Sequence, residues 1–294
     1  MNAVIENPSA LELSPFLVRG HSDFQVTRLL NGNIRKLTHS KNKLCLKAQC
    51  QKQKKFIVTN SAFLVCPVLN EFESPELYGF EMPFCRGEVA PEYIDRASPF
   101  EVRGFIKRLI ALLEGFIAES ELKHIDAEVI WSKSAAVRKH ITGNVNVSSS
   151  VLDLIDQHIA IIKLHRNFEL PIGKCHGDLT LSNIIFDDFN DQYFLIDFLD
   201  VYIESPLLDL AKISQETRLL WTSKLMHQTH DSTKYQIAMN VIDFEVQKHF
   251  SRYKWYKKYQ YIFEFQNLIR LLPYATDQTV IKAIIKRLHL LIKA

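Results

Sequence analysis

The sequence lacks the features of a disulfide-stabilised, exported or membrane-spanning protein. Its five cysteines are odd in number and no two have C-x-x-C spacing, so we expect reduced thiols and neither a disulfide frame nor a zinc site. No run of about 18 apolar residues occurs, and residues 1–13 show no basic stretch followed by an apolar core. These absences predict a cytoplasmic protein without membrane contact.

A strong excess of one charge is also missing. Lysine and arginine together number 36 and the acids 33, so the formal net charge is +3. This value is too small to predict a nucleic-acid partner. The hydrophobic content of 47% is typical of a globular protein, and 294 residues suffice for two lobes with a sizeable core. The sequence leaves a monomer and a homodimer equally open.

The hydrophobic pattern changes near residue 87 and predicts two lobes, at residues 16–87 and 88–294. In the first, QVTRLL and IRKLTH flank Asn31-Gly32-Asn33, which predicts a hairpin because Asn-Gly favours positive φ. KLCLKAQ, FLVCPVL and LYGFEMPFC are interpreted as further strands, and QKQKKFIVTN as a short helical piece. In the second, apolar residues recur at helical spacing over 100–123, 151–165, 206–228, 234–252, 255–272 and 278–293.

One strand-like segment interrupts the helical lobe and carries the candidate chemistry. Residues 183–198 are interpreted as two short strands around a turn near Asn190. Such a hairpin brings Asn183 and Asp197 together at its open end, and Asp178 lies on the loop that leads there. Convergent oxygen ligands suit Mg²⁺. Phosphoryl transfer needs this ion and a carboxylate that orients the attacking hydroxyl.

HGDLTLSN, which begins at His176, and LIDFLD, which ends at Asp200, resemble the aminoglycoside phosphotransferase and choline kinase family, relatives of the protein kinases. The resemblance is close over residues 175–211 and looser elsewhere. It implies an α+β, protein-kinase-like two-lobe fold, with a small antiparallel β lobe and a larger, mainly helical lobe. It also implies transfer of the γ-phosphate of ATP or GTP, with Mg²⁺, to a hydroxyl of a small molecule, a sugar or an amino alcohol.

Carried over by position, Asp178 resembles the catalytic base, and Asn183 and Asp197 resemble the magnesium ligands. Leu208-Asp209-Leu210-Ala211 resembles the D-L-A stretch that opens a helix and supports the catalytic loop. His176 is interpreted as structural, bonded to backbone near Asp197. IDFLDVYIESPLLDLAK is also similar to bacterial members linked to surface polysaccharide genes.

The nucleotide-binding residues follow from a weaker match in the first lobe. Lys47 in LCLKAQ resembles the strand lysine that contacts the α- and β-phosphates, with a solvated basic face as the alternative. QCQKQKK offers no glutamate to pair with this lysine. The turn at Asn31 and Gly32 resembles the nucleotide-covering loop, with a plain hairpin turn as the alternative. FEMPFCRGE resembles the hinge beside adenine and predicts base contacts from Met82, Pro83, Phe84 and Cys85.

Two other functions remain open, and the charge of the acceptor is a separate expectation. A protein Ser/Thr kinase is disfavoured because Gly177 stands where those enzymes carry arginine, and because residues 197–209 are too few for a long activation segment. A catalytically inactive scaffold with a kinase fold is disfavoured by the intact oxygen ligands. Asp200 and Glu204 follow the metal site, so we expect a neutral or cationic acceptor.

Overall fold

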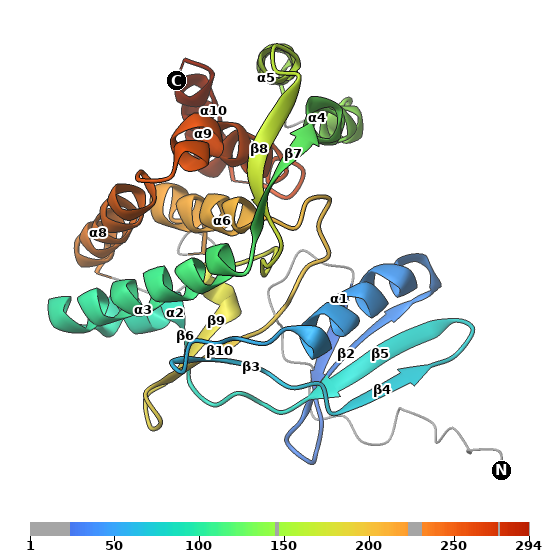
Figure 1. Cartoon of the computed structure of the whole chain (residues 1–294). Helices are drawn as coiled ribbons and strands as arrows, with labels where there is room; N and C mark the ends of the chain where they lie inside the picture. The colour runs from blue at the N-terminus through green and yellow to red at the C-terminus, as the bar shows by residue number, and fades with distance from the viewer. Residues whose placement is uncertain (1–23, 145–146, 223–230, 276, 294) are drawn as a thin grey trace.

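The computed structural model describes residues 24–144, 147–222, 231–275 and 277–293 and has the predicted two-lobe α+β architecture (Figure 1). The small lobe holds an antiparallel sheet in the order β1-β2-β5-β4. Its strands are β1 (Gln25–Arg28), β2 (Ile34–His39), β4 (Asn70–Glu73) and β5 (Leu77–Met82). The predicted β1–β2 hairpin is confirmed. Residues 16–23 of the predicted first lobe lie outside the described residues.

The prediction of a strand at KLCLKAQ is wrong, because these residues begin helix α1 (Lys43–Lys55). The alternation of Leu44 and Leu46 with polar residues suggested one buried strand face. Instead, Leu44 is 82% exposed. Leu46, Gln49, Cys50 and Gln53 are buried at a helical spacing and form the face that packs on the sheet. The predicted helical piece at QKQKK is therefore the second half of one longer helix.

A second sheet lies where the two lobes meet and contains the predicted catalytic hairpin. Its order is β3-β10-β9-β6, from β3 (Phe63–Val65), β10 (Gln192–Leu195), β9 (Ile184–Asp187) and β6 (Glu88–Val89). The hairpin prediction is confirmed to within one residue, although Asn183 lies in the 3-10 turn η3 (Leu181–Asn183) just before β9. The first lobe thus adds β3, in parallel, to a hairpin of the second.

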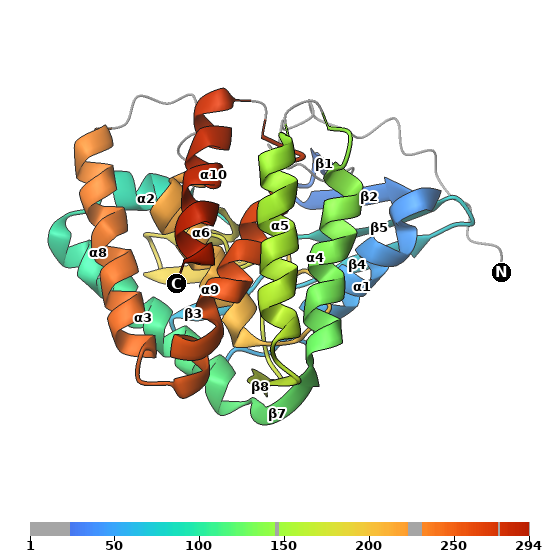
Figure 2. The ribbon, with the colours of Figure 1, turned by 90° about the horizontal axis from the view of Figure 1, so that it is seen from above.

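The large lobe is a helical bundle, in which α4, α5 and α10 lie side by side (Figure 2). All six helical predictions have a matching helix. The helix predicted over 100–123 ends earlier than expected, because residues 121–126 form a strand. The helix predicted over 206–228 lies partly outside the described residues. The sequence analysis did not predict α2, α4, β4, β6, β7 or β8. The bounds are α2 (Ala90–Arg96), α3 (Pro99–Ala118), β7 (Glu121–Asp126), α4 (Ala127–Ile141), α5 (Ser149–Lys163), β8 (Asn167–Ile172), α6 (Pro206–Leu219), α8 (Ser232–Phe250), α9 (Lys254–Ile269) and α10 (Gln278–Ile292).

The aromatic residues of α9 belong to the main hydrophobic core. Trp255, Tyr256, Tyr259 and Phe263 are all buried there. None of the described helices combines the length and the apolar character that a membrane crossing requires.

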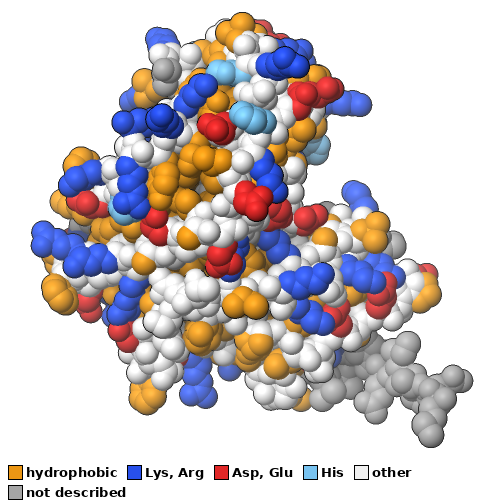
Figure 3. All heavy atoms as spheres, viewed as in Figure 1, with side chains coloured by type: hydrophobic (Ala, Val, Ile, Leu, Met, Phe, Trp, Pro, Cys, Tyr) orange, Lys and Arg blue, Asp and Glu red, His pale blue; other side chains and the backbone are white. Residues whose placement is uncertain are grey.

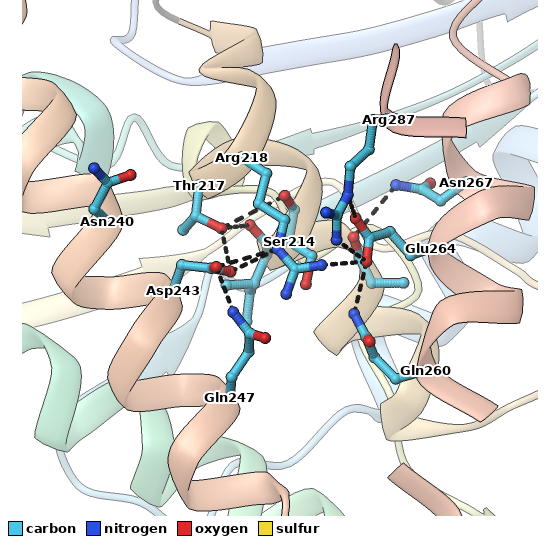
Figure 4. A network of polar contacts seen from close by, with 12 residues as sticks. Ser214, Thr217, Arg218, Asn240, Asp243, Gln247, Gln260, Glu264, Asn267 and Arg287 are labelled. Carbon is cyan, nitrogen blue, oxygen red and sulfur yellow. Dashed lines mark hydrogen bonds and ion pairs between the residues drawn. The ribbon is translucent and has the colours of Figure 1, made fainter. Parts of the chain in front are cut away.

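A buried ion network ties four helices of the large lobe together (Figure 4). Glu264 of α9 is 1% exposed. It accepts hydrogen bonds from Arg218 of α6 and from Nε of Arg287 of α10, the latter at 2.6 Å. Arg218 Nε also reaches Oδ1 of Asp243 of α8 at 3.0 Å. Since a carboxylate without charge partners is very costly inside a protein, the network fixes the relative placement of these helices.

We predict that Glu264→Gln lowers the free energy of unfolding by roughly 3–5 kcal/mol, because it leaves two half-buried guanidinium groups with too little negative charge. Urea denaturation measures this loss. Glu121→Gln is the matched control, since Glu121 forms only an exposed ion pair with Lys123 at 3.3 Å, and should cost less than about 1 kcal/mol. Equal losses in the two variants would contradict a structural role for the network.

Candidate active site

The side chain of Asp209, in the first turn of α6, supports the loop that carries Asp178. Asp209 accepts hydrogen bonds from the backbone N–H groups of His176 and Gly177, at 2.7 and 2.8 Å. Burial raises the pKa of Asp209 to about 7, and the two N–H donors oppose this shift. Helix α6 begins with Ser205 as its N-cap and Pro206 at its first position. The loop support predicted for the D-L-A stretch is therefore present.

Two further residues fix the loop. Gly177 has φ +89°, and a Cβ there would lie 2.2 Å from the carbonyl oxygen of Leu199, so only glycine fits. The His176 ring is buried, with Nε2 2.9 Å from the carbonyl oxygen of Ile196 and Nδ1 3.2 Å from the backbone N of Asp178. Both ring nitrogens are satisfied in the neutral tautomer with its proton on Nε2. The interpretation of His176 as a structural residue bonded near Asp197 is confirmed.

Asp178 is held between an amide and an ammonium group. Lys212 Nζ, from α6, lies 2.8 Å from Oδ1 of Asp178. Asn183 Nδ2 donates to the carbonyl oxygen of Asp178 at 2.8 Å and to Oδ2 at 3.2 Å. Partial burial works against the charged form, but the Lys212 ammonium outweighs it and the pKa of Asp178 falls below its ordinary value. Asp178 is therefore a fixed, ionised carboxylate at neutral pH.

Asp197 forms the second half of the site and faces the small lobe. It adopts φ +60°, a conformation that non-glycine residues rarely take and that recurs at functional sites. Its Oδ1 lies 2.9 Å from Nζ of Lys36, on β2. The backbone N–H of Ile196 donates to the carbonyl oxygen of Asn183 at 3.1 Å, so Asn183 lies across the hairpin from the residue before Asp197.

The structure corrects the choice of strand lysine. Lys47 lies on α1, is 44% exposed at its side chain and pairs with Glu73 at 2.7 Å. Lys36 has a side chain only 5% exposed and reaches the site. Its other partner is Gln49 of α1, whose Oε1 accepts from Nζ at 3.3 Å and stands where the family pattern predicts a glutamate. The signal was available, since Lys36 lies in the correctly predicted strand IRKLTH.

A second lysine of the small lobe bridges to the large lobe. Lys52 Nζ, from α1, donates to the carbonyl oxygen of Leu199 at 2.9 Å and to Oε2 of Glu204 at 2.7 Å. Glu204 is therefore neutralised by the protein itself, and Asp200 is exposed. Figure 3 shows acidic and basic side chains at the hollow between the two lobes. Glu204 therefore no longer supports the expectation of a neutral or cationic acceptor, whereas Asp200 keeps an exposed negative charge.

The predicted adenine contacts lie on the connection between the lobes. Met82 ends β5 and belongs to the small-lobe core, while Pro83, Phe84 and Cys85 follow it on the way to β6. The Cys85 and Cys66 sulfurs are 3.1 Å apart, and the Arg28 guanidinium lies 4.3 Å from the centre of the Phe84 ring. The contact joins the β1–β2 hairpin to the hinge.

The turn at Asn31 and Gly32 forms the tip of the β1–β2 hairpin. Gly32 has φ +86°, and its N–H donates to the carbonyl oxygen of Leu29 at 2.9 Å. Its amide is therefore used inside the turn. A plain hairpin turn accounts for everything observed at these two residues, and their contact with a nucleotide stays a prediction.

The oxygen atoms of Asn183 and Asp197 fit a magnesium ion. Asn183 uses Nδ2 for its hydrogen bonds to Asp178, which leaves its Oδ1 available, and Asp197 keeps Oδ2 beside the oxygen that contacts Lys36. Within the described ranges no group of three His, Cys, Asp or Glu side chains could hold a metal. A pair of oxygen ligands is nevertheless sufficient for Mg²⁺ when nucleotide phosphates complete its shell.

Comparisons with known proteins identify a matching family and similar folds. Residues 57–226 match the model of a family described as the phosphotransferase enzyme family. The GDP complex of aminoglycoside 2'-phosphotransferase-IIIa is similar in structure, with a TM-score of 0.57, 13% identity and coverage of 97% of this chain and 94% of that one. The Plasmodium vivax ethanolamine kinase Pv091845 has a TM-score of 0.50, 14% identity and coverage of 98% and 83%. At these identities both show the fold alone. No curated protein matches the chain.

The buried His176 predicts an acid-sensitive fold. Burial lowers its pKa from 6.5 to about 4, with opposing contributions from Asp178 and Asp197 and a reinforcing one from Lys52. The folded state therefore binds fewer protons than the unfolded state between these values, so stability is full above pH 6.5 and is lost as the pH falls towards 4. We predict that the wild type loses on the order of 2 kcal/mol more stability than His176→Asn between pH 6.5 and 4.5.

Urea denaturation at the two pH values measures this difference. His158, which is also buried and has its pKa lowered to about 3, contributes equally to both proteins and cancels. An identical pH dependence in wild type and variant would contradict a buried neutral His176.

Proposed function

The chain belongs to the phosphotransferase enzyme family, and on that premise we propose that it transfers the γ-phosphate of ATP or GTP to a hydroxyl group of a small molecule. The observation that carries this proposal is the placement of Asp178 between Lys212 and Asn183, beside an Asp197 that Lys36 contacts from the other lobe. This arrangement supplies a base, two metal-ligating oxygens and a phosphate-binding ammonium, which are the parts that phosphoryl transfer requires.

In this proposal, Lys36 binds the α- and β-phosphates in place of Lys47. Its nearly buried ammonium contacts Asp197 and lies beside the neutral Gln49, so its charge is only partly offset. Asn183 and Asp197 would hold Mg²⁺, which when bound would neutralise charge on the phosphates. The backbone between Met82 and Cys85 binds the adenine or guanine ring of the nucleotide. Lys36 and the two ligands thereby orient the γ-phosphate towards Asp178.

Asp178 receives the acceptor. The hydroxyl oxygen attacks the γ-phosphorus, the bond from that phosphorus to the bridging oxygen breaks, and the nucleoside diphosphate leaves with the electron pair. The hydroxyl proton passes to the Asp178 carboxylate. Lys212 and Asn183 fix the carboxylate in one orientation, which lowers the entropic cost of aligning the hydroxyl.

An inactive scaffold and a protein kinase can each be distinguished from the proposed function. Gln49 in place of a glutamate favours an inactive scaffold, while the Lys36–Asp197 contact opposes it. A protein kinase is disfavoured because only eight residues separate Asp197 from the start of α6, which leaves no room for a long activation segment. Magnesium-dependent nucleotide binding excludes the inert scaffold, and acceptor-dependent release of nucleoside diphosphate with small hydroxyl compounds excludes the protein kinase.

We predict that substitution of Asp178 affects turnover, whereas substitution of Asp197 affects nucleotide binding. Asp178→Asn should lower turnover by about 10²–10⁴ because it removes the base, and should leave Mg-nucleotide affinity nearly unchanged. Asp197→Ala should weaken Mg-nucleotide binding itself because it removes the carboxylate ligand. Steady-state kinetics and calorimetric titration measure the two effects. The assignment fails if Asp178→Asn keeps more than about a tenth of the wild-type rate.

The two candidate lysines give a matched comparison. We predict that Lys36→Met lowers affinity for ATP about tenfold or more and leaves affinity for adenosine nearly unchanged, because adenosine lacks the phosphates that the ammonium binds. Lys47→Met is the control and should change neither affinity, since Lys47 is exposed and paired with Glu73. Loss of ATP affinity in Lys47→Met alone would restore the original choice of lysine.

A further inference from the structure

A small cavity opens beside the catalytic loop, between that loop and helices α4, α6 and α9. It has a volume of about 20 Å³, close to the size of one water molecule. Gly177, next to Asp178, forms part of its wall, as does Lys212, whose ammonium contacts the Asp178 carboxylate. A group bound here would therefore lie next to the proposed base. Its lining includes Lys133, Gly177, Tyr202, Lys212, Asn267 and Arg270.

The charge of this cavity is positive. Three cations line it, and no aspartate or glutamate is among its lining residues in the described ranges. Lys212 is compensated by Asp178. Lys133 of α4 and Arg270, which follows α9, form no ion pair with a carboxylate in the part of the chain that the structure describes. Two half-buried cations thus stand in one cavity without an ion-paired carboxylate among the described residues.

These two cations affect one another and the base. Burial lowers the pKa of Lys133, and the charge of Arg270 lowers it further. The Arg270 charge also adds to the effect of Lys212 in lowering the pKa of Asp178. The Lys133 Nζ lies 5.7 Å from the centre of the Tyr202 ring, which is a weak substitute for an anion. Like charges held together in a partly desolvated cavity repel, and an anion between them would relieve that repulsion.

The same cavity offers a hydrogen-bond acceptor without a partner. Asn267 is buried, and its Nδ2 donates to Oε1 of Gln215 at 2.7 Å. Its buried Oδ1 has no hydrogen-bond partner among the described residues. A buried carbonyl oxygen of this kind is costly unless a donor reaches it. A single hydroxyl group in this water-sized cavity would satisfy Asn267, and an anionic group of the same ligand beside the cavity would offset the two cations.

We propose that the acceptor is a polyhydroxy compound with an anionic group, a carboxylate or a phosphate, which Lys133 and Arg270 bind while Asp178 receives its hydroxyl. This inference rests on the proposed phosphotransferase function and narrows it. It replaces the expectation of a neutral or cationic acceptor, because Lys52 already neutralises Glu204. Amino alcohols become poor acceptors, since their ammonium would meet two cations.

A matched acceptor panel tests the proposal. Nucleoside diphosphate release is measured with Mg-ATP and glucose, glucose 6-phosphate, glucuronate or glucosamine. We expect release to rise about tenfold or more with an anionic member over glucose, and not to rise with glucosamine. The phosphate and carboxylate members distinguish the two sources of negative charge. A preference for glucose or glucosamine overturns the anionic acceptor and leaves the phosphotransferase function intact.

A binding measurement keeps the proposal testable whichever hydroxyl compound is used. With the nucleotide site filled by Mg-ADP, inorganic phosphate at constant ionic strength should raise the Tm of the wild type and not that of the Lys133→Met/Arg270→Met double variant. Lys139→Met, an exposed position of the same helix, is the control and should respond as the wild type does. Equal Tm shifts in the wild type and the double variant overturn the proposed anion site.

Affinity for Mg-ATP distinguishes failure of the anionic-acceptor proposal from failure of the proposed phosphotransferase function. If the cations serve the acceptor, the double variant keeps its affinity for Mg-ATP, and the KM for the anionic acceptor rises about tenfold or more. A loss of Mg-ATP affinity in the double variant would instead assign the cations to the nucleotide and overturn the inference. Failure of the proposed function itself has a different signature, since the wild type would then bind no Mg-nucleotide.

Discussion

The conformation of the loop that carries Asp178 depends on one buried carboxylate. Asp209 accepts two backbone N–H groups from the residues that precede Asp178, and its own position is set by the N-terminus of α6, where Ser205 caps the helix. Buried polar groups of this kind are stable only when every partner is in place. The conformation of the loop, with a glycine at positive φ and a histidine bonded on both nitrogens, is therefore fixed by the packing of α6 against the rest of the large lobe.

The two lobes are joined by lysines that originate in the small lobe. Lys36 contacts Asp197, and Lys52 contacts Glu204 and the Leu199 carbonyl, so both bridges end between Asp197 and Glu204. The added strand β3, which pairs with β10, provides a third connection through backbone hydrogen bonds just before Asp197. Any change in the angle between the lobes therefore acts on residues 193–204, because all three connections end there.

Local features were predictable from the sequence, and contacts between distant elements were not. The hairpin at residues 183–198, the loop support by Asp209 and the bonding of His176 near Asp197 were predicted correctly, because all three lie within residues 175–211, where the family resemblance is close. Lys47 was chosen because alternating apolar residues around it mimic a strand, although the burial of Leu46 and Cys50 belongs to a helix face. The cavity cations come from α4, which was missed, and from the end of α9, so their meeting follows from tertiary packing alone.

The neutral side chain of Gln49 has a thermodynamic consequence. Among the described residues, Asp197 is the carboxylate that holds Lys36, so the lysine charge is balanced from one side only. In the proposed function, Asp197 would bind a metal ion, which would leave Lys36 with an uncharged neighbour and its full positive charge available to the phosphates. Metal and nucleotide would then favour each other, and by linkage the factor would be the same in both directions. A glutamate at residue 49 would weaken this reciprocity, because it would keep part of the lysine charge neutralised throughout.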